Sequence, residues 1–228
     1  MNAVMPLRST RARPPRAARA APAPRPNLRA QQKAATRAAI LDAALAIFSE
    51  RGFDGASTRD IAARAGVHHA LIKYHYRSKD ALWRAAVSFL FERQAQELQY
   101  TAQPRGGAEE RREQARAALR RYVQYCARHP EHGRLMVQES VHDNPRLRWA
   151  ADQFIRVTSR ASGEFIRALQ RAGVLPKVSV PALVYIMVGA AQTFYTLAPE
   201  VRRVWGIDPA DPKTIEAHVE ALLAVFIP

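Results

Sequence analysis

The stretch over residues 57–79 constrains the fold of this chain more than any other. Ala62, Gly66 and Ile72 follow one another there at offsets that allow two short helices to cross closely. A small residue permits the close approach, a glycine permits the backbone of a tight turn, and an aliphatic residue fills the junction. The spacing predicts a helix-turn-helix, with a second helix over residues 68–74 that enters the major groove of DNA.

The residues around this turn agree with that prediction. Ser57 and Asp60 have the spacing of a capping box, which begins a helix and leaves backbone N–H groups free to meet an anion such as a DNA phosphate. Apolar residues recur at helical spacing over residues 40–48, and Gly52 is expected to end that helix. We expect this helix to cover the back of the helix-turn-helix, with Tyr76 in the shared core.

Five blocks of sequence together resemble one known family. They are AILDAALAIF at residues 39–48, ERGF at 50–53, TRDIA at 58–62, AGV at 65–67, and IKYHY followed by SKDAL at 72–82. In this order they are similar to the N-terminal domain of the tetracycline-repressor (TetR) family. The resemblance implies that the chain binds double-stranded operator DNA, responds to a small-molecule effector and forms a homodimer.

The resemblance also implies an all-α fold, in which a three-helix DNA-binding domain precedes a helical ligand-binding and dimerisation domain. We expect three parts: a disordered arm at residues 1–30, the helix-turn-helix domain at 31–80, and the effector-binding and dimerisation domain at 81–228. Helical periodicity, caps and breakers predict the helices of the last part, at residues 78–99, 108–127, 131–141, 145–173, 181–197 and 212–226.

The resemblance places candidate DNA contacts on all three N-terminal helices. Lys73 can donate to a guanine edge or a phosphate, His69 can contact a base edge, and Ala70 can meet a thymine methyl. The flanking candidates are expected to hold phosphates and set the register. His68 and Lys73 depart from the family pattern, which often has a small hydroxyl residue and an aromatic there, so the preferred base sequence stays open. The full set is Lys33, Arg37, Ser57, Thr58, Arg59, His68, His69, Ala70, Lys73, Tyr74, His75 and Lys79.

The charge of the chain points to a polyanionic partner. Its 35 basic and 20 acidic residues give a formal charge of +15, for which nucleic acid is the simplest partner. Residues 1–30 contain seven arginines and no acidic residue, so they account for +7 and residues 31–228 for +8. The arm is either a solvated leader, with translation starting at Met5, or a segment that strengthens DNA binding by counterion release.

Cysteine content and the N-terminus bear on the compartment. Cys126 is the only cysteine, so no intrachain disulfide can form, which fits a reducing compartment. The N-terminus lacks the apolar segment of a signal peptide, and it resembles an organellar transit peptide only in its arginine-rich composition. We expect a cytoplasmic protein.

Residues 181–197 are apolar on nearly every side, with Gln192 as the main polar exception. A helix of this kind must be buried on every side. A membrane span is the competing interpretation, which the short apolar length and the central glutamine oppose. Together with the apolar stripe from Ile215 to Phe226, this segment has more apolar surface than one chain can cover. We expect both helices to form a homodimer interface, as the resemblance implies, without a membrane partner.

The second domain is expected to hold an apolar effector pocket between its helices. Aromatic residues and flexible methionines suit a mostly apolar cavity, and a few polar groups can orient a ligand in it. Many of these residues are expected to be ordinary core, because apolar stripes at helical spacing usually are. The candidate lining is Phe89, Tyr122, Cys126, Met136, Glu139, Phe154, Phe165, Met187 and Gln192.

Other chemistries are weakly supported. Five potential metal ligands lie close together, at His129, His132, Glu139, His142 and Asp143. Neither paired thiolates nor an HExxH motif accompany them, so we expect no metal and no other cofactor. Phosphate-loop, GxSxG and dinucleotide-binding motifs are absent from the sequence, so we do not expect an enzyme.

We therefore expect a ligand-responsive transcriptional regulator, most often a repressor in this family, which binds a palindromic operator as a homodimer. The alternative is a sequence-nonspecific architectural DNA-binding protein. Such a protein would show affinity controlled by salt alone, whereas a regulator prefers one site by several kcal/mol.

Overall fold

The computed structural model describes residues 28–99 and 104–228, and these residues form helices joined by short loops, without a β-strand. The all-α fold class is confirmed. The helices are α1 (Leu28–Gly55), α2 (Thr58–Arg64), α3 (His69–His75), α4 (Lys79–Leu98), α5 (Ala108–Arg128), α6 (Pro130–Ser140), α7 (Pro145–Ala150), the π-helix η1 (Ala151–Ile155), α8 (Arg156–Arg171), α9 (Val180–Thr196), α10 (Ala198–Trp205) and α11 (Pro212–Phe226).

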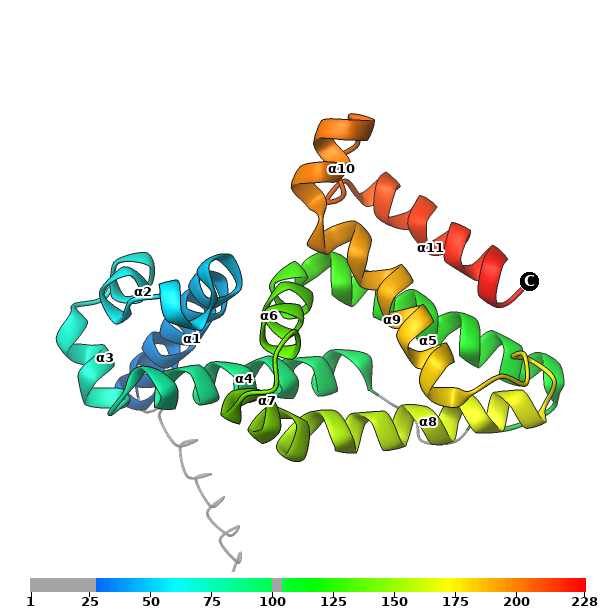
Figure 1. Cartoon of the computed structure of the whole chain (residues 1–228), viewed down its shortest axis with the longest axis horizontal. Helices are drawn as coiled ribbons and strands as arrows, with labels where there is room; N and C mark the ends of the chain where they lie inside the picture. Colours follow the sequence, from blue (N-terminus) through cyan, green and yellow to red (C-terminus); the bar gives the residue numbers. More distant parts are fainter. Residues whose placement is uncertain (1–27, 100–103) are drawn as a thin grey trace, which may run out of the picture.

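The first three helices lie at one end of the molecule, and α4 runs from them into the remaining helices (Figure 1). Gly52 breaks α1 as expected, because its φ of 69° is a left-handed value that glycine adopts without strain. Gly66 makes the turn between α2 and α3 with a φ of 65°. Ala62 is buried at the crossing, so the predicted helix-turn-helix is confirmed.

The expected arm is shorter than residues 1–30, because α1 begins at Leu28. No proline lies between Pro26 and the end of α1, so the backbone hydrogen bonds of α1 can extend back to this point. The remainder of the expected arm, residues 1–27, lies outside the described residues.

The N-terminal core extends past residue 80, where we expected the domain boundary. Phe48 and Ile61 are fully buried in this core, and Leu90 and Phe91 of α4 belong to it as well. Tyr76 is buried there, as predicted. The DNA-binding helices are therefore packed on the first half of α4 and are not joined to it by a linker.

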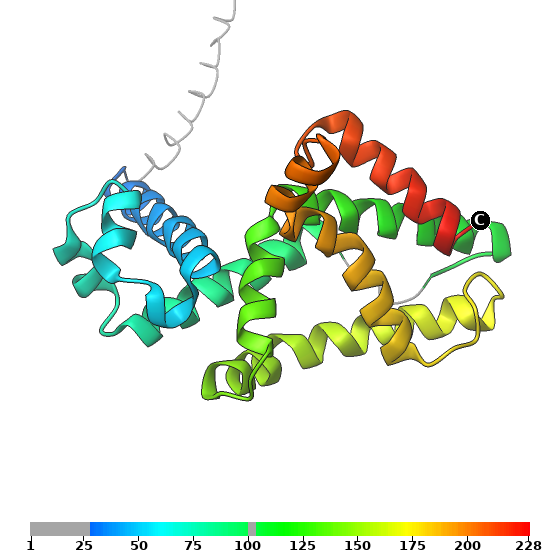
Figure 2. The same cartoon turned by 45° about the horizontal axis from the view of Figure 1, so that its top comes forward.

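A second core holds the C-terminal helices together. It includes Leu119 and Val123 of α5, Leu169 of α8 and Val219 of α11. Figure 2 shows α9 crossing between α8 and α11, with α5 behind them. The spacing of apolar residues on these helices explains the core, because the apolar side chains of each helix lie along one face and that face packs inward.

Two features of this region differ from the expected helices. The segment expected to be one regular helix from Pro145 to Gly173 contains the π-helical turn η1. Helix α10 was not predicted, since its eight residues follow α9 directly and have no break in sequence other than Pro199. Sequence periodicity detects neither a wide turn within a helix nor a helix this short.

The burial of α9 and α11 also differs from expectation. Tyr185 and Ile186 of α9 are 76% and 55% exposed, so in a single chain this helix is not buried on every side. In contrast, Val219 and Leu222 of α11 are buried, since this helix packs along α5. The stripe that we expected to be free on α11 is therefore part of the second core.

Among residues 28–99 and 104–228, no helix alone combines the length and the hydropathy that a membrane crossing requires. Helices α9 and α10 reach that threshold only when taken together, and the chain bends by 70° between them.

Candidate nucleic-acid interface and effector pocket

Helix α3 presents most of its predicted DNA-contacting side chains to solvent. His68, Ala70, Lys73 and Tyr74 are exposed, and the Tyr74 side chain is exposed over 75% of its surface. Ile72, on the opposite side of the helix, is buried in the N-terminal core. One face of α3 thus anchors the helix, and the other is free to enter a groove.

The beginning of α3 is ordered by two histidines. His68 is the N-cap, and its Nδ1 accepts a hydrogen bond from the backbone N–H of Ala70 at 3.3 Å. The imidazole therefore caps the helix in place of the small hydroxyl residue that the family pattern often has there. His69 Nε2 lies 3.0 Å from Thr58 Oγ1, which links α3 to α2. This hydrogen bond orients the His69 ring and competes with any contact between His69 and a base.

Helix α2 is fixed at both ends. The Ser57 hydroxyl accepts a hydrogen bond from the Asp60 backbone N–H at 3.1 Å, so the predicted cap is present. The Asp60 carboxylate does not complete a capping box; it pairs instead with Arg51 of α1 at 2.6 Å. Arg64 at the other end of α2 pairs with Glu50 at 2.8 Å. These exposed pairs contribute little energy each, but they set the position of α2 on α1.

Lys79, a predicted phosphate contact, is held by backbone carbonyl oxygens of the protein itself. Its ammonium donates hydrogen bonds to the carbonyl oxygens of Phe53 at 2.8 Å, Ala56 at 3.1 Å and Asp54 at 3.4 Å. A lysine has three N–H donors, so these carbonyls occupy all of them. Lys79 instead closes the end of α1 against the start of α4.

The remaining predicted DNA contacts are exposed or partly exposed. Lys33, Arg37 and Arg59 are exposed, and His75 is partly buried with its ring 5.1 Å from that of Tyr74. Two further exposed residues were missed, Leu71 on α3 and Arg77 between α3 and α4. Arg77 could have been found from its place between the third helix and the Ser78 cap. Leu71 carries no sequence signal that separates it from the core.

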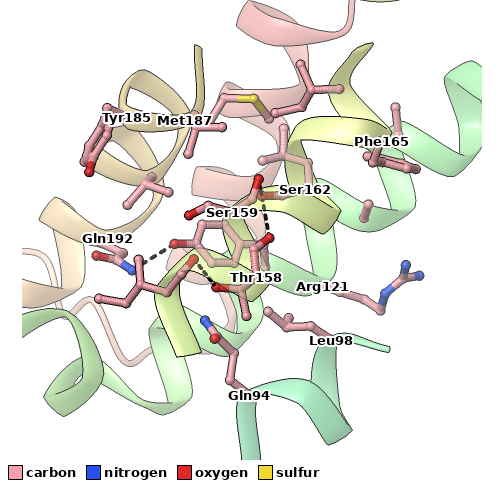
Figure 3. A pocket seen from close by; sticks show the side chains of 18 of the residues that line it. Gln94, Leu98, Arg121, Thr158, Ser159, Ser162, Phe165, Tyr185, Met187 and Gln192 are labelled. Carbon is pink, nitrogen blue, oxygen red and sulfur yellow. Dashed lines mark hydrogen bonds between the residues drawn. The ribbon is translucent and has the colours of Figure 1, made fainter. Parts of the chain in front are cut away.

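A cavity of about 340 Å³ lies between α4, α5, α6, α8 and α9. We expected a pocket between the helices of the second domain, to which these five belong, and the size falls in the range of small-molecule sites. The structure brings five of the predicted lining residues together at this cavity: Tyr122, Met136, Phe165, Met187 and Gln192. Figure 3 shows Met187 and Gln192 on the α9 side and Phe165 on α8.

Four predicted lining residues lie elsewhere. Phe89 packs against the N-terminal core, and Phe154 stacks on Phe91 with 4.9 Å between ring centres. Cys126 is buried in the second core, where burial raises the pKa of its thiol to about 12. The Glu139 carboxylate is buried and accepts two hydrogen bonds of 3.1 Å from Arg146. Helical spacing correctly predicts that these side chains face inward. It does not tell which of the two cores, or the cavity, each side chain reaches.

Sequence reasoning missed most polar residues of the cavity. Hydroxyl groups from α8 line it, and so does His132 of α6, which is buried and has its Nδ1 2.8 Å from the Tyr125 hydroxyl oxygen. Burial lowers the pKa of His132 to about 3, so its imidazole is neutral at physiological pH. The complete set of missed polar residues is Gln94, Arg121, His132, Ser140, Thr158, Ser159 and Ser162.

The cluster of potential metal ligands is dispersed into other interactions. His129 Nε2 lies 2.8 Å from a Glu97 carboxylate oxygen, and Asp143 pairs with Arg148 at 2.7 Å. Across the part of the chain that the structure describes, no three His, Cys, Asp or Glu side chains gather in an arrangement suited to a metal ion.

Known proteins share both the N-terminal segment and the full arrangement of helices. A family model described as "Bacterial regulatory proteins, tetR family" matches residues 40–86. The HTH-type transcriptional regulator RutR of Escherichia coli strain K12 is 25% identical over 203 residues, which are 87% of this chain and 92% of RutR. The HTH-type transcriptional repressor Rv3405c of Mycobacterium tuberculosis strain H37Rv is 49% identical over 53 residues, which are 23% of this chain and 28% of that protein.

Solved structures show the same fold. SCO4942 from Streptomyces coelicolor has a TM-score of 0.61 at 22% identity, covering 84% of this chain and 98% of its own. AibR, solved in complex with isovaleryl coenzyme A and operator DNA, has a TM-score of 0.64 at 18% identity and covers 85% and 98%. Residues 40–86 thus match the TetR family of bacterial regulatory proteins, and most of the chain aligns with a transcriptional regulator and shares the fold of SCO4942 and AibR.

Proposed function

We propose that this regulator is a repressor that binds a palindromic operator as a homodimer and releases it when a small molecule occupies the cavity. The observation that carries the proposal is the exposed face of α3, with Lys73 and Tyr74 free on a helix that Ile72 anchors in the core. A rigid helix with a free polar face suits direct contact with base edges in the major groove. A regulator of this kind acts where the DNA is, so a cytoplasmic location is part of the proposal.

Different residues are assigned to base contact and to phosphate contact. Lys73 and Ala70 lie on the free face of α3 and are proposed to contact bases. Arg77, Lys33 and Arg37 are exposed cations that are proposed to hold phosphates and set the register.

The exposed apolar surface of α9 supports the homodimer. Tyr185 and Ile186 lie on it, and the outer side of α11 adds the exposed alanines Ala217 and Ala221. A second copy would cover this surface through an isologous contact, since two-fold symmetry is the commonest way to close a homo-oligomer. Such a dimer would place two α3 helices one DNA turn apart, about 34–36 Å, which matches a palindrome.

The cavity supports regulation by a ligand. It is bordered by α4, the helix whose first half belongs to the core of the DNA-binding helices. A ligand that favours the arrangement unable to bind DNA by about 1–3 kcal/mol is sufficient to act as an inducer. AibR, which shares the fold, was solved with both a ligand and operator DNA.

Selection from random duplex DNA tests the proposed function. The full chain should enrich one palindromic sequence, and affinity for that sequence should exceed affinity for random DNA by a factor of about 10³ or more at physiological salt. Enrichment without any sequence preference would support the architectural alternative and overturn the proposal.

Light scattering tests the dimer. Ile186→Glu should convert the dimer to monomer and abolish tight operator binding, because it places a charge in the proposed interface. The matched control is Val157→Glu, the same change at a 63% exposed valine of α8, which should leave the dimer intact. A wild-type monomer at micromolar concentration that still binds its operator tightly would rule out the dimer.

A further inference from the structure

The Gln94 side chain is a buried amide without a partner. It projects from α4 into the cavity, where it is only 7% exposed (Figure 3). Among the described residues, no hydrogen-bond donor or acceptor pairs with its amide group. Its amide faces the open space of the cavity, so it is suited to a polar atom of a ligand.

Three other polar side chains that line the cavity are already paired. The Thr158 hydroxyl donates to the carbonyl oxygen of Phe154 at 3.1 Å, and Ser162 donates to the carbonyl oxygen of Thr158 at 2.9 Å. The Gln192 amide nitrogen donates to the Tyr122 hydroxyl at 2.8 Å. The amide nitrogen of Gln94 has no partner among the described residues, and it is suited to an acceptor on the ligand.

The charge around the cavity has one sign. Among the described residues that line it there is no aspartate, glutamate or lysine, and Arg121 is the one permanently charged residue. Arg121 is exposed at the edge of the cavity and forms no ion pair with any described residue. The neighbouring Arg120, in contrast, is paired with Glu216 and Glu220. Because no carboxylate of the described residues faces the cavity, a cationic ligand would find no ion-pair partner there, whereas an anion would be attracted by Arg121.

We propose that the ligand of this cavity is an apolar monocarboxylic acid, bound as its anion. Its carboxylate accepts a hydrogen bond from the Gln94 amide and is attracted by Arg121, while its hydrocarbon part lies among the apolar side chains of α5, α8 and α9. These include Leu119, Ile166 and Met187. The assignment rests on the proposed function, since it names the class of molecule that would act at the effector cavity.

Calorimetric titration of the full chain with three matched series of ligands tests this assignment. The series are straight-chain carboxylates from hexanoate to dodecanoate, the primary amides of the same lengths, and the primary amines of the same lengths. We expect the carboxylates to bind, the amides to bind about tenfold more weakly and the amines to show no binding, in line with one charge-assisted contact.

Variants separate the two polar contacts. Arg121→Gln should weaken carboxylate binding about tenfold and leave amide binding unchanged. Gln94→Glu should abolish carboxylate binding through repulsion, whereas Gln94→Leu should weaken carboxylates and amides alike. Arg160→Gln removes the same charge from an exposed position on α8 outside the cavity and serves as the control. Circular dichroism establishes that each variant is folded.

Three results would overturn the assignment: amines that bind as tightly as carboxylates, an Arg121→Gln variant with unchanged carboxylate affinity, or a carboxylate series that does not bind at all. Measuring operator binding in the presence of each ligand tests the proposed function separately from the ligand class. Carboxylates that bind through Gln94 and Arg121 without releasing DNA would leave the ligand class standing and contradict regulation. Release of DNA by a cationic compound bound in the cavity would support regulation through the cavity and contradict the ligand class.

Discussion

Lys79, the first residue of α4, holds the end of α1 through Phe53. The Lys79 ammonium lies 4.5 Å from the centre of the Phe53 ring and donates to the Phe53 carbonyl oxygen at 2.8 Å. On the other side, the guanidinium of Arg146 lies 3.9 Å from the centre of the same ring. One aromatic side chain therefore joins the DNA-binding helices to α4 and to the start of α7.

Lys79→Met is expected to destabilise the fold. The substitution keeps the apolar stem but leaves carbonyl groups at the end of α1 without their donor, which costs about 1–3 kcal/mol. Urea unfolding measures this loss. Operator affinity should fall only to the extent that the folded population falls, and a variant as stable as the wild type with uniformly weaker DNA binding would restore a phosphate-contacting role for Lys79.

Lys73→Ala is expected to have the opposite profile. Lys73 is exposed on α3, so the free energy of unfolding should change by less than about 0.5 kcal/mol. Binding should weaken by about 1–3 kcal/mol, selectively at one base pair of each half-site. The control is Arg77→Ala, which should weaken all sequences alike. Equal losses on operator and random DNA for Lys73→Ala would contradict base contact.

The buried ion pair between Glu139 and Arg146 should be structural. Glu139 is only 4% exposed, so Arg146→Met leaves a buried carboxylate without its partner and should cost about 3–5 kcal/mol in thermal or urea unfolding. The double variant with Glu139→Met should recover most of this loss, because no unpaired charge remains. If Arg146→Met unfolds like the wild type, Glu139 is free to act as the polar anchor that the sequence suggested.

Filling the cavity should abolish the response to effector. Ser162→Phe on α8 places a ring in the cavity, and we expect unchanged fold and operator affinity with loss of ligand-induced release. Gel-shift titration with effector measures this. Cys126→Trp is a contrasting change, since Cys126 lies in the packed core and a larger side chain there should destabilise the fold by about 1–3 kcal/mol. Normal release by Ser162→Phe would place the ligand elsewhere.

Stability should depend on pH through His132. Burial lowers the pKa of this imidazole from 6.5 to about 3 in the folded chain, so the unfolded chain binds the proton more tightly. Above pH 6.5 this histidine does not lower the free energy of unfolding, because it is neutral in both states. As the pH falls from 6.5 toward 3, the unfolded chain gains a proton that the folded chain does not bind, so the free energy of unfolding decreases. At pH 5 the loss is about 2 kcal/mol. His132→Asn should show a smaller decrease in melting temperature between pH 7 and pH 5, and equal decreases would contradict the neutral, buried state.

The amino-acid sequence by itself determined the DNA-binding unit. Small and apolar residues at fixed offsets, the Ser57 cap and the turn at Gly66 are local features, and local features are sufficient to specify short helices and the way they cross. The same applies to the cap and length of α4, for which Ser78 and the apolar spacing predicted both ends. Periodicity, caps and breakers predicted most helices of the second domain, and the all-α class followed from the family resemblance.

Only the tertiary structure decided which inward-facing side chains meet. Phe154 and Phe165 lie on one helical stripe, but the π-helical turn and the division into two cores send Phe154 toward Phe91 and leave Phe165 at the cavity. The surroundings of Lys79 and Gln94 could not be predicted from the sequence either. Neither the carbonyls that surround Lys79 nor the cavity beside Gln94 arises from neighbours in sequence, because both depend on contacts between helices that the chain brings together only when folded.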